Sequence, residues 1–338
     1  MSATLPAAWS ARLPAAIPGL LFALMFGLAG LWLAQSPWLQ SWQLSALTVA
    51  IVLGMVIGNT LGTRLSPALH PGIVFSQRTL LRAGVVLYGL RLSFHDVAAI
   101  GVTGLLVDTI VVLSTLGLGV WVGQRWFGLD RDTALLTAAG SAICGAAAVL
   151  AVERVIRPDA NKVAIAVASV VLFGTMNIFL YPRLFPLLGF DAATFGLYAG
   201  ATVHEVAQVV AVGSAISPET ADAAVVVKLT RVLMLVPVLL FLGWSESRRG
   251  GQRHMVIPWF ALGFVAVVAL NSVLTLPAEV RRLLLALDTL LLATAMGALG
   301  LETRFAKIKA LGPRPLLLAA VLFLWLSVGG YLLIRALH

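Results

Sequence analysis

The fold is decided by an apolar stretch with polar residues at its centre, ATFGLYAGATVHEVAQVVAVGS at residues 193–214. It is long enough to cross a membrane, which takes about 20 mainly apolar residues. Its small and polar residues are Gly200, Thr202, His204, Glu205, Gln208 and Gly213. Such residues permit unwound backbone at membrane depth only where that backbone faces protein or a water-filled cavity. The stretch therefore predicts a broken or re-entrant helix instead of a plain membrane span.

Ten further apolar segments predict an all-α membrane protein. They cover residues 15–35, 44–63, 72–91, 97–122, 132–152, 162–182, 222–244, 256–275, 283–301 and 313–336. No linker is long enough to hold a soluble domain. We therefore expect one polytopic domain over residues 1–338, with about ten or eleven transmembrane segments.

The composition supports this fold class. The 338 residues are 60% hydrophobic and 11% charged, whereas a soluble domain is about 25% charged. The net charge of +9 comes from short clusters between apolar blocks, and no basic stripe with interleaved aromatic residues indicates nucleic-acid binding. Cys144 is the single cysteine, so no intrachain disulfide and no multi-cysteine metal site can form.

The basic residues indicate that segment 132–152 is also interrupted. Short cytoplasmic loops are rich in Lys and Arg. If this segment crossed the membrane fully, Arg154, Arg157 and Lys162 would lie outside. If it enters and returns, they lie inside, and segment 193–214 must then re-enter from the outer side. The alternative is that the small residues of the two segments only let helices pack closely.

An internal repeat supports the same architecture. Residues 83–101 read AGVVLYGLRLSFHDVAAIG, and residues 294–312 read TAMGALGLETRFAKIKALG. Both contain a Gly-Leu pair, a polar patch, a Phe and a closing Gly, and an apolar helix follows each. An odd number of predicted crossings separates them, so we expect inverted repeats, which are common in secondary transporters with a site at the midplane.

The candidate site residues come from the two interrupted segments and their neighbours. Ionisable groups within the membrane are costly and point to function, which predicts coupling roles for His204, Glu205 and Asp108. His204 and Glu205 could instead hydrogen-bond locally and pin a broken helix. Lys228 and Arg231 lie one turn apart and could line an anion site, or could snorkel to the interface. The predicted substrate-binding residues are Gly140, Ser141, Cys144, Gly145, Thr202, His204, Glu205, Gln208, Lys228 and Arg231.

Two enzyme motifs are weak. His204-Glu205-Val206-Ala207-Gln208 resembles the HExxH zinc motif, but Gln208 stands where the second histidine ligand is needed. We therefore expect no metal and no cofactor. Cys144 has no histidine near it in sequence, so an intramembrane enzyme that pairs Cys144 with His204 is only an alternative, and we expect no enzyme activity.

Several strings resemble the YeiH family of sulfate exporters. They are LLRAGVVLYGLRLSF at 80–94, GSAICGAAAVLA at 140–151, ATVHEVAQVVAVGSAISP at 201–218, IPWFALGF at 257–264 and LDTLLLATAMGALGLETRF at 287–305. The resemblance covers roughly residues 15–336. It implies an inner-membrane protein of about ten or eleven helices, similar to the cation–proton antiporters and bile-acid symporters, with inverted repeats and discontinuous helices.

Residues and resemblance together predict a secondary transporter. We expect it to export a small anion such as sulfate, sulfite or a sulfonate, coupled to a proton or sodium ion. A cation–proton antiporter is the alternative within transport. We expect membrane lipid around the protein and no nucleic-acid partner. Whether the protein forms a homodimer is left open.

Overall fold

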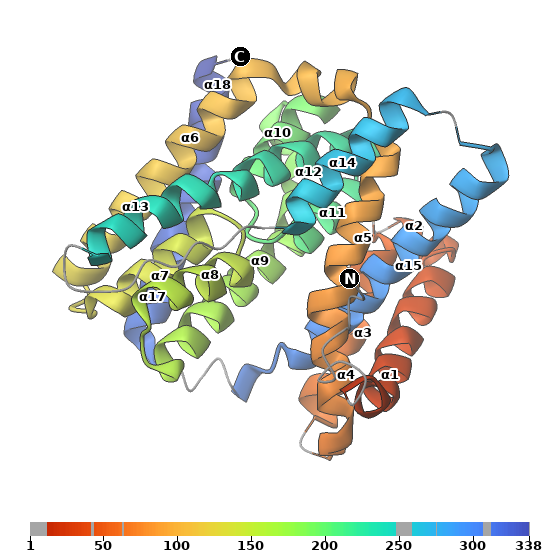
Figure 1. The fold of residues 1–338 in the computed structure, drawn as a ribbon, viewed down its shortest axis with the longest axis horizontal. Helices are drawn as coiled ribbons and strands as arrows, with labels where there is room; N and C mark the ends of the chain where they lie inside the picture. The colour runs from red at the N-terminus through yellow and green to blue at the C-terminus, as the bar shows by residue number, and fades with distance from the viewer. Residues whose placement is uncertain are drawn as a thin grey trace, which may run out of the picture. The chain divides into compact units, whose positions relative to one another are not determined.

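The computed structural model describes residues 12–41, 44–62, 64–247, 259–274, 276–306 and 312–337. Within these ranges the chain is helical and contains no strand (Figure 1). It packs as two compact units, and each is described by itself. Unit 1 comprises Met1–Leu90 and Leu274–Phe305, and unit 2 comprises Arg91–Val273 and Ala306–His338. The expectation of a single domain stays a prediction.

Unit 1 is a bundle of closely packed helices. Its elements are α1 (Arg12–Leu33), α2 (Pro37–Ser41), α3 (Ala46–Thr60), η1 (Pro67–Leu69), α4 (His70–Phe75), η2 (Ser76–Leu80), α5 (Leu81–Tyr88) and α15 (Ala278–Glu302). The short η3 (Gly89–Arg91) follows α5. Glycines let the backbones touch: a Cβ at Gly54 would meet the Gly297 carbonyl oxygen at 2.2 Å. Small residues at helix contacts are typical of membrane bundles.

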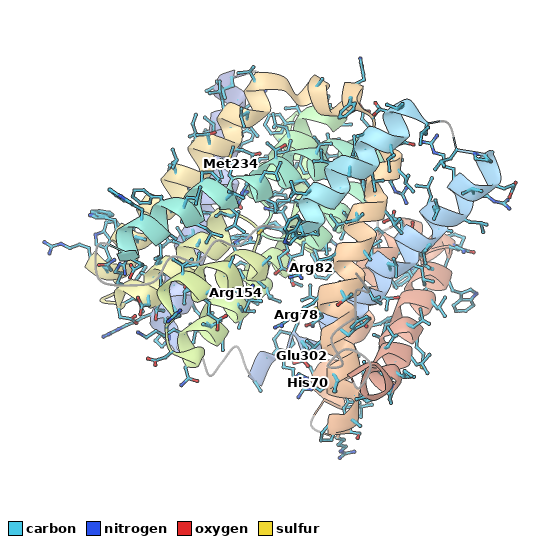
Figure 2. The ribbon with its side chains drawn as sticks, in the orientation of Figure 1. His70, Arg78, Arg82, Arg154, Met234 and Glu302 are labelled. Carbon is cyan, nitrogen blue, oxygen red and sulfur yellow. The ribbon has the colours of Figure 1, made fainter. Side chains whose placement is uncertain are left out.

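Unit 2 holds the interrupted segments. Its elements are α6 (Phe94–Arg125), α7 (Arg131–Ala142), α8 (Ala146–Ile156), α9 (Ala160–Leu188), α10 (Ala192–Thr202), α11 (Val206–Ser214), α12 (Pro218–Leu233), α13 (Leu235–Ser247), α14 (Trp259–Val273), α17 (Pro313–Leu324), η4 (Trp325–Gly329) and α18 (Gly330–Leu337). Segment 222–244 bends at Met234, labelled in Figure 2. Pro237 lacks the amide hydrogen that would bond back one turn, which explains this bend.

The predicted interruption of segment 132–152 is confirmed. α7 ends at Ala142 and α8 begins at Ala146. Lys162, at the start of α9, lies 2.7 Å from Asp130, which precedes α7. A Cβ at Gly140 would also contact Val170 of α9, so α9 runs parallel to α7. The chain has therefore returned to its starting end, and α7–α8 is a re-entrant hairpin.

Segment 193–214 forms a second hairpin of the same kind. α10 ends at Thr202 and α11 begins at Val206. The Thr220 hydroxyl donates to the Ala192 carbonyl at 3.1 Å, and a Cβ at Gly200 would meet the Ala224 carbonyl oxygen at 2.5 Å. α12 is thus parallel to α10, and α10–α11 returns to the end at which it began. In Figure 1, α10 lies above α7 within unit 2.

The two hairpins form a repeat that the sequence reading missed. Asp130 caps α7 by accepting from the Thr133 amide at 3.2 Å. Asp191 caps α10 by accepting from the Thr194 amide at 2.7 Å. Each cap is followed by a half-helix, a break, a returning half-helix and a long helix parallel to the first half. The paired Asp-x-x-Thr caps are the sequence signal for this repeat.

Charge assigns sides to the hairpins. The end of unit 2 where α7–α8 begins and returns carries Arg125, Arg131, Arg154, Arg157 and Lys162. The end where α10–α11 begins carries Asp191, Glu219 and Asp222, with the basic residues Arg91, Arg183 and Arg335. The positive-inside rule places the first end in the cytoplasm. α9 runs from the first end to the second, so the two hairpins begin at opposite ends of unit 2. That the first end is the cytoplasmic one stays a prediction from the charges.

The predicted segments correspond to helices of the structure. Six described helices are long and apolar enough to cross a membrane: Ala15–Leu33, Gly101–Arg125, Asn161–Leu188, Pro218–Glu246, Ala278–Glu302 and Pro313–Leu337. The closing glycines of the predicted repeat, Gly101 and Gly312, both have positive φ, 58° and 76°. The inverted orientation of that particular repeat stays a prediction.

Candidate functional site

The tips of the two hairpins meet through Glu205. Its Oε1 accepts a hydrogen bond from the backbone amide of Ala146, the first residue of α8, at 3.0 Å. The carboxylate approaches closely because Gly145 has no side chain: a Cβ there would lie 2.3 Å from Glu205 Cγ. Gly145 also has φ +68°, a conformation that favours glycine. The GSAICG string thus makes room for a carboxylate from the other hairpin.

Two buried cations of α12 bind the opposite half-helix ends. Arg231 donates from Nε to the Ala142 carbonyl at 2.6 Å and from Nη2 to the Ser141 carbonyl at 2.7 Å. Its Nη1 donates to the Ala201 carbonyl, and Lys228 Nζ donates to the Val203 carbonyl. Both side chains are fully buried. They therefore satisfy carbonyl groups that the breaks leave free, and they do not snorkel to the interface.

The helix dipoles explain this arrangement. A helix carries partial positive charge at its start and partial negative charge at its end. The ends of α7 and α10 meet the cations Arg231 and Lys228. The starts of α8 and α11 meet the carboxylate of Glu205, which is itself the residue before α11. Four half-helix termini are thus matched by side chains of opposite sign in the core of unit 2.

Asp108 adds a second buried carboxylate. It lies on α6, is fully buried, and has no hydrogen-bond partner for either oxygen among the described residues. Lys228 and Arg231 act on it electrostatically. The core therefore holds two acidic and two basic groups, and its formal charge is balanced when all four are ionised.

Other buried polar atoms lack partners within the described part of unit 2. They include Ser141 Oγ, His204 Nδ1, Gln208 Nε2, Thr175 Oγ1 and Asn177 Oδ1. Most buried polar groups are hydrogen-bonded, and an unpaired one calls for an explanation such as a ligand or water. Gln208 is informative because its Oε1 accepts from the Glu205 amide at 3.1 Å, which leaves its NH2 group unpaired beside the hairpin tip.

Thr202 belongs to a neighbouring hydroxyl cluster that the sequence reading missed. Its hydroxyl donates to the Tyr198 carbonyl at 2.6 Å and accepts from the Tyr181 hydroxyl at 3.0 Å. Tyr181 and Tyr198 stack with ring centroids 4.9 Å apart, and the Tyr198 hydroxyl donates to the Ser327 carbonyl at 2.9 Å. Ser327 lies in the π-helix η4, and no local motif marks that turn in the sequence.

The structure brings most of the predicted site residues together. Gly145, Glu205 and Gln208 lie at the hairpin tips, and Ser141, Lys228 and Arg231 are joined through carbonyl contacts. Cys144 and His204 lie buried within the two breaks. Gly140 instead packs against Val149 and Val170, and Thr202 faces the tyrosine cluster. Substrate contact by any of these residues stays a prediction.

A salt bridge fixes the cytoplasmic end of the first hairpin. Lys162 lies 2.7 Å from Asp130 and 3.5 Å from Asp132. Partial burial acts to raise the pKa of Asp130, but hydrogen bonds from Lys162 and Thr133 outweigh it and lower the pKa from 3.8 to about 2. The ion pair between Lys162 and Asp130 therefore needs an ionised Asp130.

Unit 1 carries a separate pair of arginines. Arg78 and Arg82 are exposed on the continuous helical run from α4 through η2 to α5, near its middle (Figure 2). η2 is a π-helix, a form that recurs at functional sites. On the same unit, His70 lies 3.5 Å from Glu302. Cations in the middle of a predicted membrane helix are costly unless they face water, protein or an anion.

Unit 2 also carries an apolar groove of about 980 Å³ that is open to the surface, since Leu113, Trp121 and Phe241 in its lining are more than half exposed. Residues of α6, α7 and α13 line it, and it extends from Thr109 to Gln124 and Arg125 at the cytoplasmic end. Its lining offers few polar groups, so it does not have the chemistry of an anion site.

Comparison with known proteins agrees with this architecture. The family model described as conserved hypothetical protein 698 matches residues 18–319. A UPF0324 membrane protein of Pseudomonas aeruginosa is 50% identical over 332 residues, 94% of each chain. The UPF0324 inner membrane protein YeiH of Escherichia coli K12 is 48% identical over 321 residues, 93% of this chain and 92% of YeiH. No solved structure matches.

Fold and site together define a multi-pass membrane protein with two opposed re-entrant hairpins. The chain belongs to the UPF0324 family, described as conserved hypothetical protein 698. The resemblance to YeiH proteins and the inner-membrane location predicted from the sequence are confirmed.

Proposed function

We propose that the protein is a secondary transporter of a small anion, with its binding site where the two hairpin tips meet. The observation that carries the proposal is the contact between Glu205 and the Ala146 amide. Discontinuous helices that meet at the midplane are the usual construction of a transporter site. The starts of α8 and α11 present backbone amides and positive dipole ends, which favour an anion.

Positive charge elsewhere supports an anionic substrate. Arg78 and Arg82 place two cations on the surface of unit 1 in the middle of a helical run. Exposed charge of one sign raises the local concentration of oppositely charged solutes. The resemblance to YeiH suggests sulfate, sulfite or a sulfonate as the substrate and export as the direction.

The buried carboxylates suit a coupled transporter. Glu205 and Asp108 are the acidic groups within the core of unit 2, and His204 lies beside Glu205. We propose that these residues couple transport to a proton, with sodium as the other candidate ion.

Transport by proteoliposomes tests this proposal. Labelled sulfate, sulfite and methanesulfonate would be offered with and without a pH gradient, to the wild type and to Glu205→Gln. The variant should lose gradient-driven transport while keeping a monodisperse fold. Glu219→Gln, the same change at an exposed site on α12, is the matched control. Unchanged transport by Glu205→Gln would remove the coupling role.

A cation–proton antiporter is the second candidate, because Glu205 and Asp108 are also suitable cation ligands. A dye that reports internal pH separates the two readings: sodium alone, without any anion of the panel, would move protons only in an antiporter. We further propose that the protein is not an enzyme and that membrane lipid surrounds it, and native mass spectrometry would show whether it forms a homodimer.

A further inference from the structure

We propose that Glu205 is a tethered anion that occupies the substrate position, so that an external anion binds only when Glu205 has taken up a proton. The inference rests on the proposed function and deepens it, because it says how the proton and the anion share one site. It starts from the contact of Glu205 Oε1 with the Ala146 amide at 3.0 Å.

The position that Glu205 holds is the natural place for a free anion. The first amides of a helix have no partner within the helix, and the dipole favours negative charge there. α8 is 11 residues long and begins at Ala146. Its N-terminal neighbour Gly145 offers no side chain to cap it, so the cap comes from Glu205 of the other hairpin.

A second observation points to a ligand at the same place. Gln208 is fully buried, its Oε1 accepts from the Glu205 amide, and its Nε2 has no acceptor among the described residues. A buried amide NH2 group without a partner is costly. The Gln208 amide lies beside the start of α11 and against Gly174 of α9, where a Cβ would come within 2.7 Å of Nε2. We infer that an oxygen of an anion bound at the tip supplies the missing acceptor.

Charge balance gives the number of protons taken up with each monovalent anion. With Glu205, Asp108, Lys228 and Arg231 all ionised, the buried core is neutral, so a monovalent anion would add one uncompensated negative charge. Uptake of one proton by Glu205 restores neutrality and weakens its hold on the Ala146 amide. The balanced step is Glu205 carboxylate plus proton plus anion going to Glu205 carboxylic acid with the anion bound.

Other groups around Glu205 are poorer proton acceptors. The titratable and charged groups on the surrounding elements are Lys228 and Arg231 on α12, Asp108 on α6, Cys144 in the first hairpin, Tyr181 on α9, and Tyr198 and His204 on the second hairpin. Both cations already bind carbonyl groups, and a charged His204 would add positive charge beside them. Asp108 is therefore the main competitor, and a variant tests it.

A carrier with this site moves the anion and the proton together. Net export then requires an outward anion gradient larger than the inward proton gradient. The same coupling keeps the empty site closed, because Glu205 satisfies the helix start when no anion is present.

Equilibrium binding to the full-length purified protein tests the inference. The probe for the proton linkage is methanesulfonate, which stays monovalent from pH 5 to pH 8 and is measured by calorimetry over that range. Sulfate and sulfite serve to show whether an anion binds at all. Linkage to one proton predicts that affinity for the bound probe falls about tenfold per pH unit where Glu205 is ionised. Calorimetry in buffers of different ionisation enthalpy should show close to one proton taken up per anion.

Variants separate the possible outcomes. Glu205→Gln should bind the probe tightly with no pH dependence, and Glu219→Gln, at an exposed position of α12, should keep the wild-type pH dependence. Ala146→Pro removes the shared amide at the first helical position, where proline is tolerated, and should weaken binding roughly tenfold or more at every pH. Ala192→Pro is the matched control at the start of α10. Thermal melts confirm that each variant folds.

Failure of the tethered-anion inference can be told apart from failure of the proposed anion transporter. Binding of a probe that is independent of pH in the wild type, or unchanged in Glu205→Gln, overturns the tethered-anion inference but leaves the anion transporter. A pH dependence that persists in Glu205→Gln and is lost in Asp108→Asn would assign the proton to Asp108 and also overturns it. No binding of any probe by folded wild type or folded Glu205→Gln at any pH overturns the proposed anion transporter itself.

Discussion

The guanidinium of Arg231 donates to the carbonyl of Ala142, 89 residues earlier in the chain, at 2.6 Å. Through its other nitrogens it also reaches Ser141 and Ala201, so one side chain joins the ends of two half-helices. A cation at this junction is needed for the breaks to be tolerated in the core, because unsatisfied backbone groups within a membrane protein are costly.

Replacing Arg231 should therefore destabilise the protein strongly. Arg231→Met leaves the carbonyl oxygens of Ser141, Ala142 and Ala201 without this donor and the end of α7 without a cation. We expect the free energy of unfolding to fall by roughly 3–5 kcal/mol, visible as a lower midpoint of thermal unfolding in detergent. Arg231→Lys keeps the charge, and its free energy of unfolding should lie between those of the wild type and Arg231→Met. Arg335→Met, at an exposed position of α18, should change little, and an equal effect of both Met variants would contradict this role.

Gly145 should not tolerate alanine. Its φ is +68°, a backbone conformation that is strained for residues with a side chain. The added methyl would also meet Glu205 Cγ at 2.3 Å. Gly145→Ala should therefore lower both the thermal midpoint and transport. Gly117→Ala on α6, where a Cβ meets nothing within 4 Å, should be neutral or stabilising by up to about 1 kcal/mol. Equal stability of the two variants would contradict the tight approach of the hairpin tips.

Acid should weaken the cytoplasmic end of the first hairpin. The pKa of Asp130 is lowered from 3.8 to about 2, so its contribution is complete above about pH 4 and is lost as the pH falls toward 2. Asp130→Asn keeps a good helix cap and loses the ion pair, whereas Asp130→Ala loses both at a cost of about 1 kcal/mol. The stability difference between wild type and Asp130→Asn should shrink as the pH falls through this range, and a difference that grows would contradict the assignment.

Cys144 should be dispensable for activity. It is buried in the first break with 4% of its surface exposed, and an intramembrane enzyme would need it as the nucleophile. Cys144→Ala should keep wild-type transport. Wild-type protein should react slowly with a thiol reagent until it is unfolded in detergent. Complete loss of activity in a well-folded Cys144→Ala would favour the enzyme reading.

Arg78 and Arg82 should speed substrate capture. Arg78→Gln and Arg82→Gln each remove a cation from the surface of unit 1, and we expect kcat/KM for the transported anion to fall roughly tenfold. The loss should diminish at high ionic strength, since salt screens exposed charges. Arg335→Gln is the matched control. A fall that is independent of salt would indicate a structural role instead.

Much of the architecture could be predicted from the sequence. Runs of apolar residues marked the helices, and the basic cluster at Arg154, Arg157 and Lys162 showed that segment 132–152 returns. These features are local or depend only on charge counts. Partners of Lys228 and Arg231 could not be predicted, because a backbone carbonyl leaves no trace in the residue type. The hairpin repeat was missed because its two copies share little besides the Asp-x-x-Thr caps.

The junction made by Arg231 also has a consequence for biogenesis. The α7–α8 hairpin leaves the ribosome well before α12 does, so its carbonyls at Ser141 and Ala142 reach the membrane without their donor. We expect the first hairpin to stay shallow or shielded by the insertion machinery until α12 is synthesised. Chains that end before α12 should then be recognised by membrane proteases, although every residue of the first hairpin is present.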